Sequence, residues 1–377
     1  MKLRLTTLAA AVGMALAGPA AAETDLDKLR AEVEQLKQKV ESAAEWKDPK
    51  TLVHMAGYAD VGYVDAEGTP GSFLVGTFAP IFHYQFNNMV MLESEMELEV
   101  DENGNTEVGL EYLTVDFLFH NNAALVVGKF LSPLGQFRQN LHPSWINKMA
   151  SAPVGFGHDE AAPNAEVGAQ LRGGFGLGRT RANYAVYIAN GPAVELDGTG
   201  TELEMVETPG LNADTDGKKV VGGRFGLLLP GPRLELGVSA ATGEVGEITT
   251  PSSTVVRDYQ VQGVDFTWRP GDFNVVGEYI RQEVGANAAS TAPEEGVWDA
   301  WYLQVAYRFP ATDWEVVARY GEYDTPGTEA DREQLALGVN YVFASNFVAK
   351  VNFESNDNPN PGEEAGDRWY LQLAYGF

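Results

Sequence analysis

A row of glutamates at every second position is the clearest arrangement of charged side chains in this sequence. The row consists of Glu93, Glu95, Glu97 and Glu99, and Leu92, Met96 and Leu98 stand between them. In an extended strand, residues two apart project to the same face. The carboxylates would therefore form one acidic face opposite an apolar face. The chemistry available to such a face is electrostatic, because it attracts cations and repels anions where it meets water.

Side chains suited to covalent or metal chemistry are sparse. Cysteine is absent, and the five histidines, His54, His83, His120, His142 and His158, show no metal-ligand spacing. The chain has no G-x-S-x-G, P-loop or C-x-x-C-H motif, and no EF-hand spacing. Ser132 and Ser144 lie near His142 in sequence only, and polar loop roles account for them better than a Ser–His pair. We therefore predict a protein that is not an enzyme, with no cofactor and no metal site.

Composition narrows the class of protein further. The chain has 377 residues, with 26 basic and 53 acidic side chains and a formal net charge of -27. This acidity argues against nucleic acid as a partner, because nucleic-acid binders need a basic surface. A hydrophobic content of 44% excludes a disordered polyanion. We therefore expect a folded protein whose acidic side chains serve a purpose other than nucleic-acid binding.

The first 47 residues predict export and then a helix. Residues 1–22 combine Lys2 and Arg4, a short apolar stretch and an A-x-A cleavage site, which together indicate a signal peptide. Residues 23–47 place apolar side chains at alternating spacings of three and four, the seam of a coiled coil. The seam predicts an oligomeric coil; the alternative is a single amphipathic helix packed on the rest of the protein. Asp48-Pro49 would end the helix.

From residue 52 to 377 the apolar period is two, which predicts strands. Sixteen strands are expected at 53–63, 72–86, 89–100, 106–119, 123–131, 166–175, 181–189, 219–229, 233–243, 258–268, 272–283, 297–309, 313–323, 332–343, 346–356 and 366–377. Short and long connections alternate between them, with 101–105 as a short exception. An even strand number with alternating short turns and long loops is typical of an outer-membrane β-barrel. We predict this all-β fold; the alternative is a large soluble sandwich or propeller.

Aromatic residues near the strand ends support the barrel. They are Trp298, Trp301, Phe309, Trp314, Tyr341, Phe343, Trp369 and Phe377. Rings at these positions are typical of the two girdles that mark the membrane–water interfaces. We therefore expect all of them on the outer face.

The barrel region resembles Gram-negative porins, specifically the porin O/P-like, phosphate-selective group. The resemblance covers residues 52–377 and rests on Gly-Lys-Phe-Leu-Ser-Pro-Leu-Gly at 128–135 and on the terminal Tyr-Leu-Gln-Leu-Ala-Tyr-Gly-Phe at 370–377. It implies a homotrimer and a third external loop that folds inward. It also implies that the C-terminal Phe377 is read by the barrel-assembly machinery, and that lipid and lipopolysaccharide surround the barrel.

The strand period also predicts which charged residues line the interior. The acidic set is Glu93, Glu95, Glu97, Glu99, Glu111 and Glu166. The basic set is Arg172, Arg181, Arg224, Arg233, Arg308, Arg319, Lys350 and Arg368. Charge on the lipid face would cost about 2–4 kcal/mol near the midplane, so these side chains should face water. Opposed acidic and basic arcs would set up a transverse field across the lumen.

The connection 132–165 is the expected constriction loop. Its charged residues include Arg138, Lys148, Asp159 and Glu160, and a helical turn is expected near 143–150. We predict that the loop enters the lumen; the alternative is an external surface loop.

These features predict a porin for passive diffusion of small hydrophilic solutes and ions. The absence of a lysine-rich cluster departs from the phosphate-selective group, so we expect a mildly cation-preferring or weakly selective pore instead of anion preference. The alternative for the acidic loops at 195–216 and 357–367 is a solvated face or a divalent-cation bridge to lipopolysaccharide. Two other roles remain open. One is a barrel that sheathes a partner such as an electron-transfer cytochrome, and the other is a tether to peptidoglycan through the N-terminal coil.

Overall fold

The computed structural model describes residues 51–377 apart from 102, 215, 249–254, 328–330 and 358–365. The predicted signal peptide (1–22) and coiled-coil segment (23–47) lie outside the described residues. Val53–Phe377 forms one compact unit, and the description below concerns this unit.

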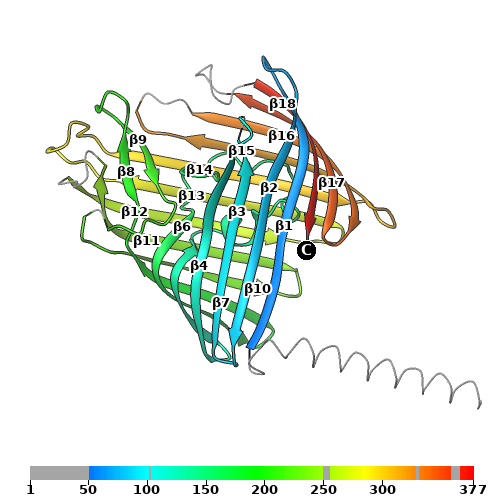
Figure 1. The fold of residues 1–377 in the computed structure, drawn as a ribbon, viewed down its shortest axis with the longest axis horizontal. Coiled ribbons are helices and arrows are strands. Elements are labelled where there is room, and N and C mark those ends of the chain that lie inside the picture. Colours follow the sequence, from blue (N-terminus) through cyan, green and yellow to red (C-terminus); the bar gives the residue numbers. More distant parts are fainter. Residues whose placement is uncertain (1–50, 102, 215, 249–254, 328–330, 358–365) are drawn as a thin grey trace, which may run out of the picture. The chain divides into compact units, whose positions relative to one another are not determined.

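Sixteen strands form the wall of this unit (Figure 1). They are β1 Thr51–Ala66, β2 Ser72–Phe86, β3 Val90–Val100, β4 Thr106–His120, β5 Ala123–Leu131, β6 Ala165–Leu177, β7 Thr180–Ala189, β10 Val220–Leu229, β11 Leu234–Glu247, β12 Val256–Trp268, β13 Phe273–Val284, β14 Gly296–Arg308, β15 Trp314–Asp324, β16 Arg332–Ala344, β17 Phe347–Asp357 and β18 Gly366–Gly376. Each strand pairs with its neighbours along the chain, β7 pairs with β10, and β1 pairs with both β2 and β18. The sheet is therefore a closed antiparallel barrel.

The observed strands agree closely with those predicted from the period. The largest difference in a strand end is four residues, at β11, which was predicted to end at 243 and ends at Glu247. Alternation of apolar and polar residues sets the two faces of each strand, and tight turns such as Asn87–Met89 limit its length. These two signals together determine the strand positions.

One pair of short strands was not predicted. Strands β8 (Ala193–Leu196) and β9 (Leu203–Glu207) form an antiparallel hairpin inside the connection 190–218. Strand β8 also pairs in parallel with the end of β11, where Gly246 lies opposite Ala193. Strands of four and five residues are too short to show a clear period, so their pairing with β11 could not be read from the sequence.

The outer face is apolar and carries most of the predicted aromatic residues. Trp314, Phe343 and Trp369 are exposed, and rings of adjacent strands contact one another, as in Trp314 and Tyr341, whose centroids are 4.9 Å apart. The prediction for Trp298 was wrong, because its side chain is 1% exposed. Trp298 belongs to the even-numbered residues of β14, which face inward, and it lies in a buried apolar cluster that includes Leu203 and Phe156.

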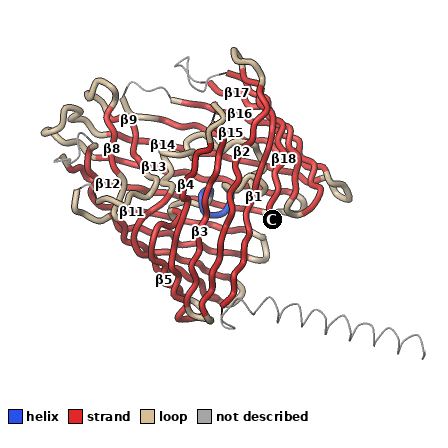
Figure 2. Tube along the Cα trace, in the orientation of Figure 1, coloured by secondary structure: helices blue, strands red, loops and turns tan. Residues whose placement is uncertain are grey.

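The described part of the chain contains little helix. One π-helical turn, η1 (Phe137–Leu141), lies within the loop 132–165 and is drawn in blue in Figure 2. The predicted helical turn near 143–150 is a single hydrogen-bonded turn, in which the N–H groups of Ile146 and Asn147 donate to the Pro143 carbonyl. Among the described residues, no helix has the length and apolar character needed to cross a membrane.

Candidate functional site

The loop 132–165 begins at a buried carboxylate on β13. Glu278 accepts hydrogen bonds from the backbone N–H groups of Gln136 and Phe137, at 3.1 and 3.0 Å. Gly135, with φ of 75°, donates its N–H to the Ser239 hydroxyl on β11. A Cβ at position 135 would lie 1.6 Å from Glu278 Oε1, so only glycine permits this close approach. The start of the loop is thereby fixed to the inner face of the wall.

The middle of the loop is held by two cations on the inner face. Arg319 of β15 donates to the Ser151 carbonyl at 3.0 Å, to the Ser151 hydroxyl at 2.7 Å and to the Ala152 carbonyl at 2.9 Å. Lys350 of β17 donates to the Met149 carbonyl at 2.9 Å and also to the Ser144 carbonyl. Arg319 and Lys350 are 1% and 2% exposed. The expectation that both meet lumen water was therefore wrong, because the loop covers them.

Neutral and acidic side chains extend this contact along the same wall. Asn340 of β16 donates to the Lys148 carbonyl at 2.9 Å, and Asn352 of β17 accepts from the Ala150 N–H at 2.7 Å. The Lys148 ammonium is 2.7 Å from a Glu315 carboxylate oxygen on β15. The loop thus lies against the inner faces of β13 and β15 to β17.

The opposite side of the loop faces β1, β3 and β4. His142 Nε2 is 3.8 Å from Glu95 Oε1, and the His142 ring packs edge-on against Tyr58 of β1. Arg138 is 7% exposed, and its Nε donates to the Asn164 side-chain oxygen at 2.7 Å. Its Nη2 is buried and makes no hydrogen bond to any described residue. Contacts on both sides mean that the loop spans the interior between the two walls.

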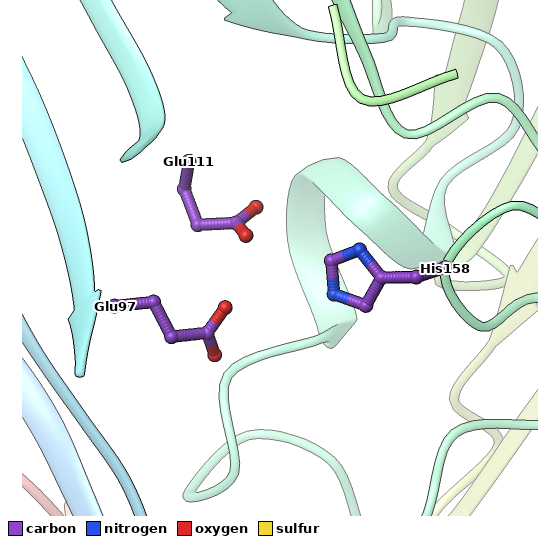
Figure 3. Close-up of side chains that lie close together, drawn as sticks. All are labelled: Glu97, Glu111 and His158. Atoms are coloured by element: carbon purple, nitrogen blue, oxygen red, sulfur yellow. The ribbon is translucent and has the colours of Figure 1, made fainter. Parts of the chain in front are cut away.

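A cluster of two carboxylates and an imidazole lies where the loop approaches the acidic wall. Figure 3 shows Glu97 of β3 and Glu111 of β4 directed toward His158 of the loop, and their ligand atoms lie within 4.8 Å of one another. The β3–β4 register shifts between Glu95 and Met96, which makes Glu111 the extra residue of a bulge and turns it to the Glu97 side.

The loop side of this cluster is positively charged. Partial desolvation of the His158 ring and then the charge of Arg138 lower the pKa of the imidazole. The ring contacts the Asn164 amide at 3.2 Å. Two carboxylates and an imidazole are suitable ligands for one divalent cation. Arg138 opposes such an ion, however, because its charge acts on the same Glu111 carboxylate.

Two of the remaining predicted basic residues are paired with acidic side chains of the wall. Arg172 lies 2.6 Å from Asp116 and 3.4 Å from Glu93. Arg224 makes a bidentate pair with Asp265, at 2.6 and 2.8 Å. These pairs use acidic partners two strands away along the wall, on β4 for Arg172 and on β12 for Arg224, and leave the two guanidinium charges largely compensated.

The other predicted basic residues lie near the ends of the wall. Arg308 donates to Thr312 and Asp313 in its own turn, Arg181 is exposed at the start of β7, and Arg368 is half-buried in β18. The prediction for Arg233 was wrong, because it lies outside β11 in a turn with φ of 53°.

The remaining acidic residues have varied environments. Glu99 accepts a hydrogen bond from Thr77 at 3.0 Å and stays exposed, whereas Glu166 is 5% exposed. Water contact was expected for Glu166 and also for Glu95, which is 2% exposed, and the burial of both contradicts it. Asp159 accepts from the Thr208 N–H at 2.9 Å. Glu160 pairs with Arg332 of β16 at 2.6 Å.

Sequence reasoning missed several residues that hold the loops, and two buried charged residues illustrate this. Glu278 anchors the constriction loop, as described above. Arg257 of β12 is 2% exposed, pairs with Glu247 at 2.6 Å and donates to the carbonyls of Gly285, Ala292 and Glu294. Both residues follow an ordinary strand pattern, so only the arrangement of distant loops distinguishes them.

The barrel and its inward loop prompted a comparison with known proteins. The family model described as Gram-negative porin matches residues 7–361. The chain belongs to this family. Its barrel is therefore that of an outer-membrane channel protein. The porin O/P-like subgroup remains a prediction. No curated protein sequence matches the chain.

Solved porin structures share the fold. An anion-selective porin from Comamonas acidovorans has a TM-score of 0.60 at 15% identity, covering 87% of this chain and 100% of that one. The outer-membrane channel DcaP of Acinetobacter baumannii has a TM-score of 0.60 at 10% identity, covering 88% and 99%. OmpT of Vibrio cholerae in its trimer form has a TM-score of 0.54 at 14% identity, covering 87% and 99%. At these identities the likeness concerns the fold alone.

Proposed function

We propose that this porin is a passive diffusion channel for small hydrophilic solutes and ions, narrowed by the loop 132–165. The observation that carries the proposal is the loop's attachment to both walls, through Glu278, Arg319 and Lys350 on one side and His142 on the other. A sixteen-stranded barrel is too wide to be filled by its own side chains. A loop fixed across it limits the size of solutes that pass. The same loop argues against a sheath for a cytochrome, which needs an open lumen.

The charge around the narrow region favours weak cation preference. Arg172, Arg224 and Arg319 each have a carboxylate partner within 3.6 Å. The acidic wall, by contrast, presents Glu97, Glu99 and Glu111 together. These three carboxylates outnumber Arg138, whose charge acts on Glu111 and Glu97 from the loop. An excess of carboxylates raises the local concentration of cations in a water-filled pore. The proposed preference is therefore the reverse of that implied by the resemblance to the phosphate-selective group.

Reversal potential in a salt gradient tests the selectivity. We expect the wild-type channel in a planar bilayer to favour K⁺ over Cl⁻, and Glu97→Gln/Glu111→Gln to move the reversal potential toward zero. Glu322→Gln/Glu333→Gln is the matched control, because both glutamates lie on the outer face and the two double variants lose the same number of charges. An anion-selective wild-type channel would overturn the proposal.

Removal of the loop tests the constriction. A variant lacking residues 140–160 loses the segment held by Arg319 and Lys350 and should show a higher single-channel conductance. Liposome swelling with sugars of increasing size should show a raised exclusion limit in the same variant. Unchanged conductance and unchanged size exclusion would refute the proposed role of the loop.

The proposed assembly is a homotrimer. A trimer form is named for the Vibrio cholerae relative, and the heptad segment 23–47 is suited to associating copies of the chain. Native mass spectrometry of the detergent-solubilised protein should give three chains. The proposed contacts of Phe377 with the assembly machinery, of the outer face with lipopolysaccharide, and of the coil with peptidoglycan are separate expectations. A peptidoglycan pull-down tests the last of them.

A further inference from the structure

Two histidines on the first two strands lie together, apart from the constriction. His54 belongs to β1 and His83 to β2, and their Nδ1 atoms are 3.4 Å apart. The ring centroids are 5.5 Å apart and the ring planes are inclined by 37°. The two residues are 29 positions apart in sequence, which is why no motif spacing revealed them. The proposed diffusion function makes no use of this pair.

The separation of the two nitrogens matches shared coordination better than a direct hydrogen bond. Hydrogen bonds to nitrogen donors have heavy-atom distances of about 2.7–3.2 Å, so 3.4 Å is long for one. Two imidazole ligands at about 2.0–2.1 Å from a tetrahedral Zn²⁺ are separated by roughly 3.3–3.4 Å. The side chains therefore already stand at the distance that a bound ion requires.

The surroundings of His83 favour the tautomer of the neutral ring that is needed for binding. A ligating nitrogen must carry a lone pair, and the other ring nitrogen then carries the hydrogen. His83 Nε2 is 3.4 Å from Glu93 Oε1, so the carboxylate favours hydrogen at Nε2 and leaves Nδ1 free to bind. Glu93 is itself contacted by Arg172, which pairs with Asp116. A carboxylate behind a ligating histidine is the usual arrangement at protein metal sites.

The pair is also accessible to an ion from solution. His54 is exposed, and the His83 side chain is 28% exposed. Both residues lie near the short-turn end of the barrel, His54 close to the start of β1 and His83 close to the end of β2. In an outer-membrane barrel this end faces the periplasm. Two protein ligands leave coordination positions that water or a small solute can fill.

We propose that His54 and His83 form a binding site for a divalent transition-metal ion of the zinc, copper and nickel class at the periplasmic mouth. Imidazole ligands select this class over Mg²⁺ and Ca²⁺, which prefer oxygen. His54 Nδ1 and His83 Nδ1 are the ligands, and Glu93 is a positioning residue that acts through His83. The site stands independently of the channel proposal, so failure of either leaves the other intact.

Metal titration of the purified full-length protein tests the site. Isothermal titration with Zn²⁺ should detect one site per chain, and His54→Gln or His83→Gln should weaken it at least tenfold. Glu93→Gln should weaken it by about 10- to 100-fold without abolishing it. His120→Gln is the matched control, because His120 ends β4 beside another turn at the same end of the barrel, and its loss should leave the affinity unchanged. Cu²⁺ electron paramagnetic resonance should show two coordinated imidazole nitrogens, reduced to one in each histidine variant.

Three results would overturn the proposal. The first is a wild-type protein that binds no Zn²⁺ at millimolar concentration, and the second is equal affinity of wild type and both histidine variants. The third is loss of binding in His158→Gln but not in His54→Gln, which would place the ion at Glu97, Glu111 and His158. His54 is exposed, so His54→Gln should preserve the heat-modifiable barrel on gels and give a clear reading of affinity.

Discussion

Replacing Arg319 with methionine should release the constriction loop while leaving the barrel closed. Methionine keeps most of the side-chain volume and removes the guanidinium that donates to Ser151, Ala152 and Gln334. It also leaves Glu354, which is 1% exposed and lies 3.6 Å from Arg319, as a buried charge without its cation. The backbone pairing of β15 with β14 and β16 does not involve the guanidinium and remains.

The expected cost follows from the burial of both partners. Breaking a buried ion pair by removing one member costs about 3–5 kcal/mol. At about 1.4 kcal/mol for each tenfold change, the ratio of docked to undocked loop should fall by roughly 10² to 10³·⁶. Arg319→Met/Glu354→Gln should be less destabilised than the sum of the two single variants, with a coupling of about 0.5–3 kcal/mol. If the double variant is more stable than the sum of the two single variants predicts, the unpaired Glu354 carboxylate is the source of the lost stability.

Single-channel recording and urea unfolding provide the measurements. Arg319→Met should show larger current fluctuations or a higher conductance state, and a lower unfolding midpoint. Arg308→Met is the matched control, because Arg308 occupies the same inner face but donates only to its own turn. That control should cost less than about 1 kcal/mol. If Arg319→Met shows the same current noise and the same unfolding midpoint as the wild type, the anchoring role of the pair is refuted.

Three further outcomes are expected. Lys350→Met removes three hydrogen bonds from a buried ammonium, so it should increase current noise and cost about 3 kcal/mol in urea unfolding. Asp197→Asn should loosen the β8–β9 hairpin, because hydrogen bonds from Thr199 and neighbouring N–H groups to the carboxylate lower the pKa of Asp197. In the wild type, the protection of Leu203–Glu207 from hydrogen exchange should be present above about pH 4 and should fall as the pH drops below it. In the wild type, loop stability should fall on acidification from about pH 6.5 to 5, because a histidine whose pKa is lowered by folding costs stability as the pH drops below its unfolded pKa. His158→Gln should abolish this loss, and loop proteolysis across the same pH range measures the difference.

The wall of the barrel could be predicted because each strand carries its own signal. Side-chain alternation identifies the face of a residue such as Lys350, and this assignment needs no knowledge of distant segments. The sequence signal for where a strand begins or ends is weaker, and Arg233 shows the consequence. The turn Pro230-Gly231-Pro232 extends one residue further than expected, so Arg233 has a left-handed backbone and no place on the wall. A shift of one residue decides the face or removes the residue from the strand.

The contacts inside the barrel could not be predicted in the same way. Arg319 and Lys350 have the expected face, but their burial depends on carbonyl groups of residues 144–152, about 170 to 200 positions away. No local pattern specifies which segment of the loop covers which strand. The bulge that brings Glu111 beside Glu97 is likewise a property of the β3–β4 pairing and not of either strand alone.

The distribution of ion pairs changes what the total charge implies for the lumen. Face assignment alone suggests that a broad basic arc opposes the acidic row. In the structure, Arg224 is neutralised by Asp265 and Arg319 by Glu354, so these cations contribute little field beyond their immediate partners. Arg138 differs, because its nearest acidic groups stand across the gap on the wall and not beside it. The transverse field at the constriction therefore depends on a few facing groups, Arg138 and His158 against Glu97 and Glu111, and its sign cannot be obtained by counting charges.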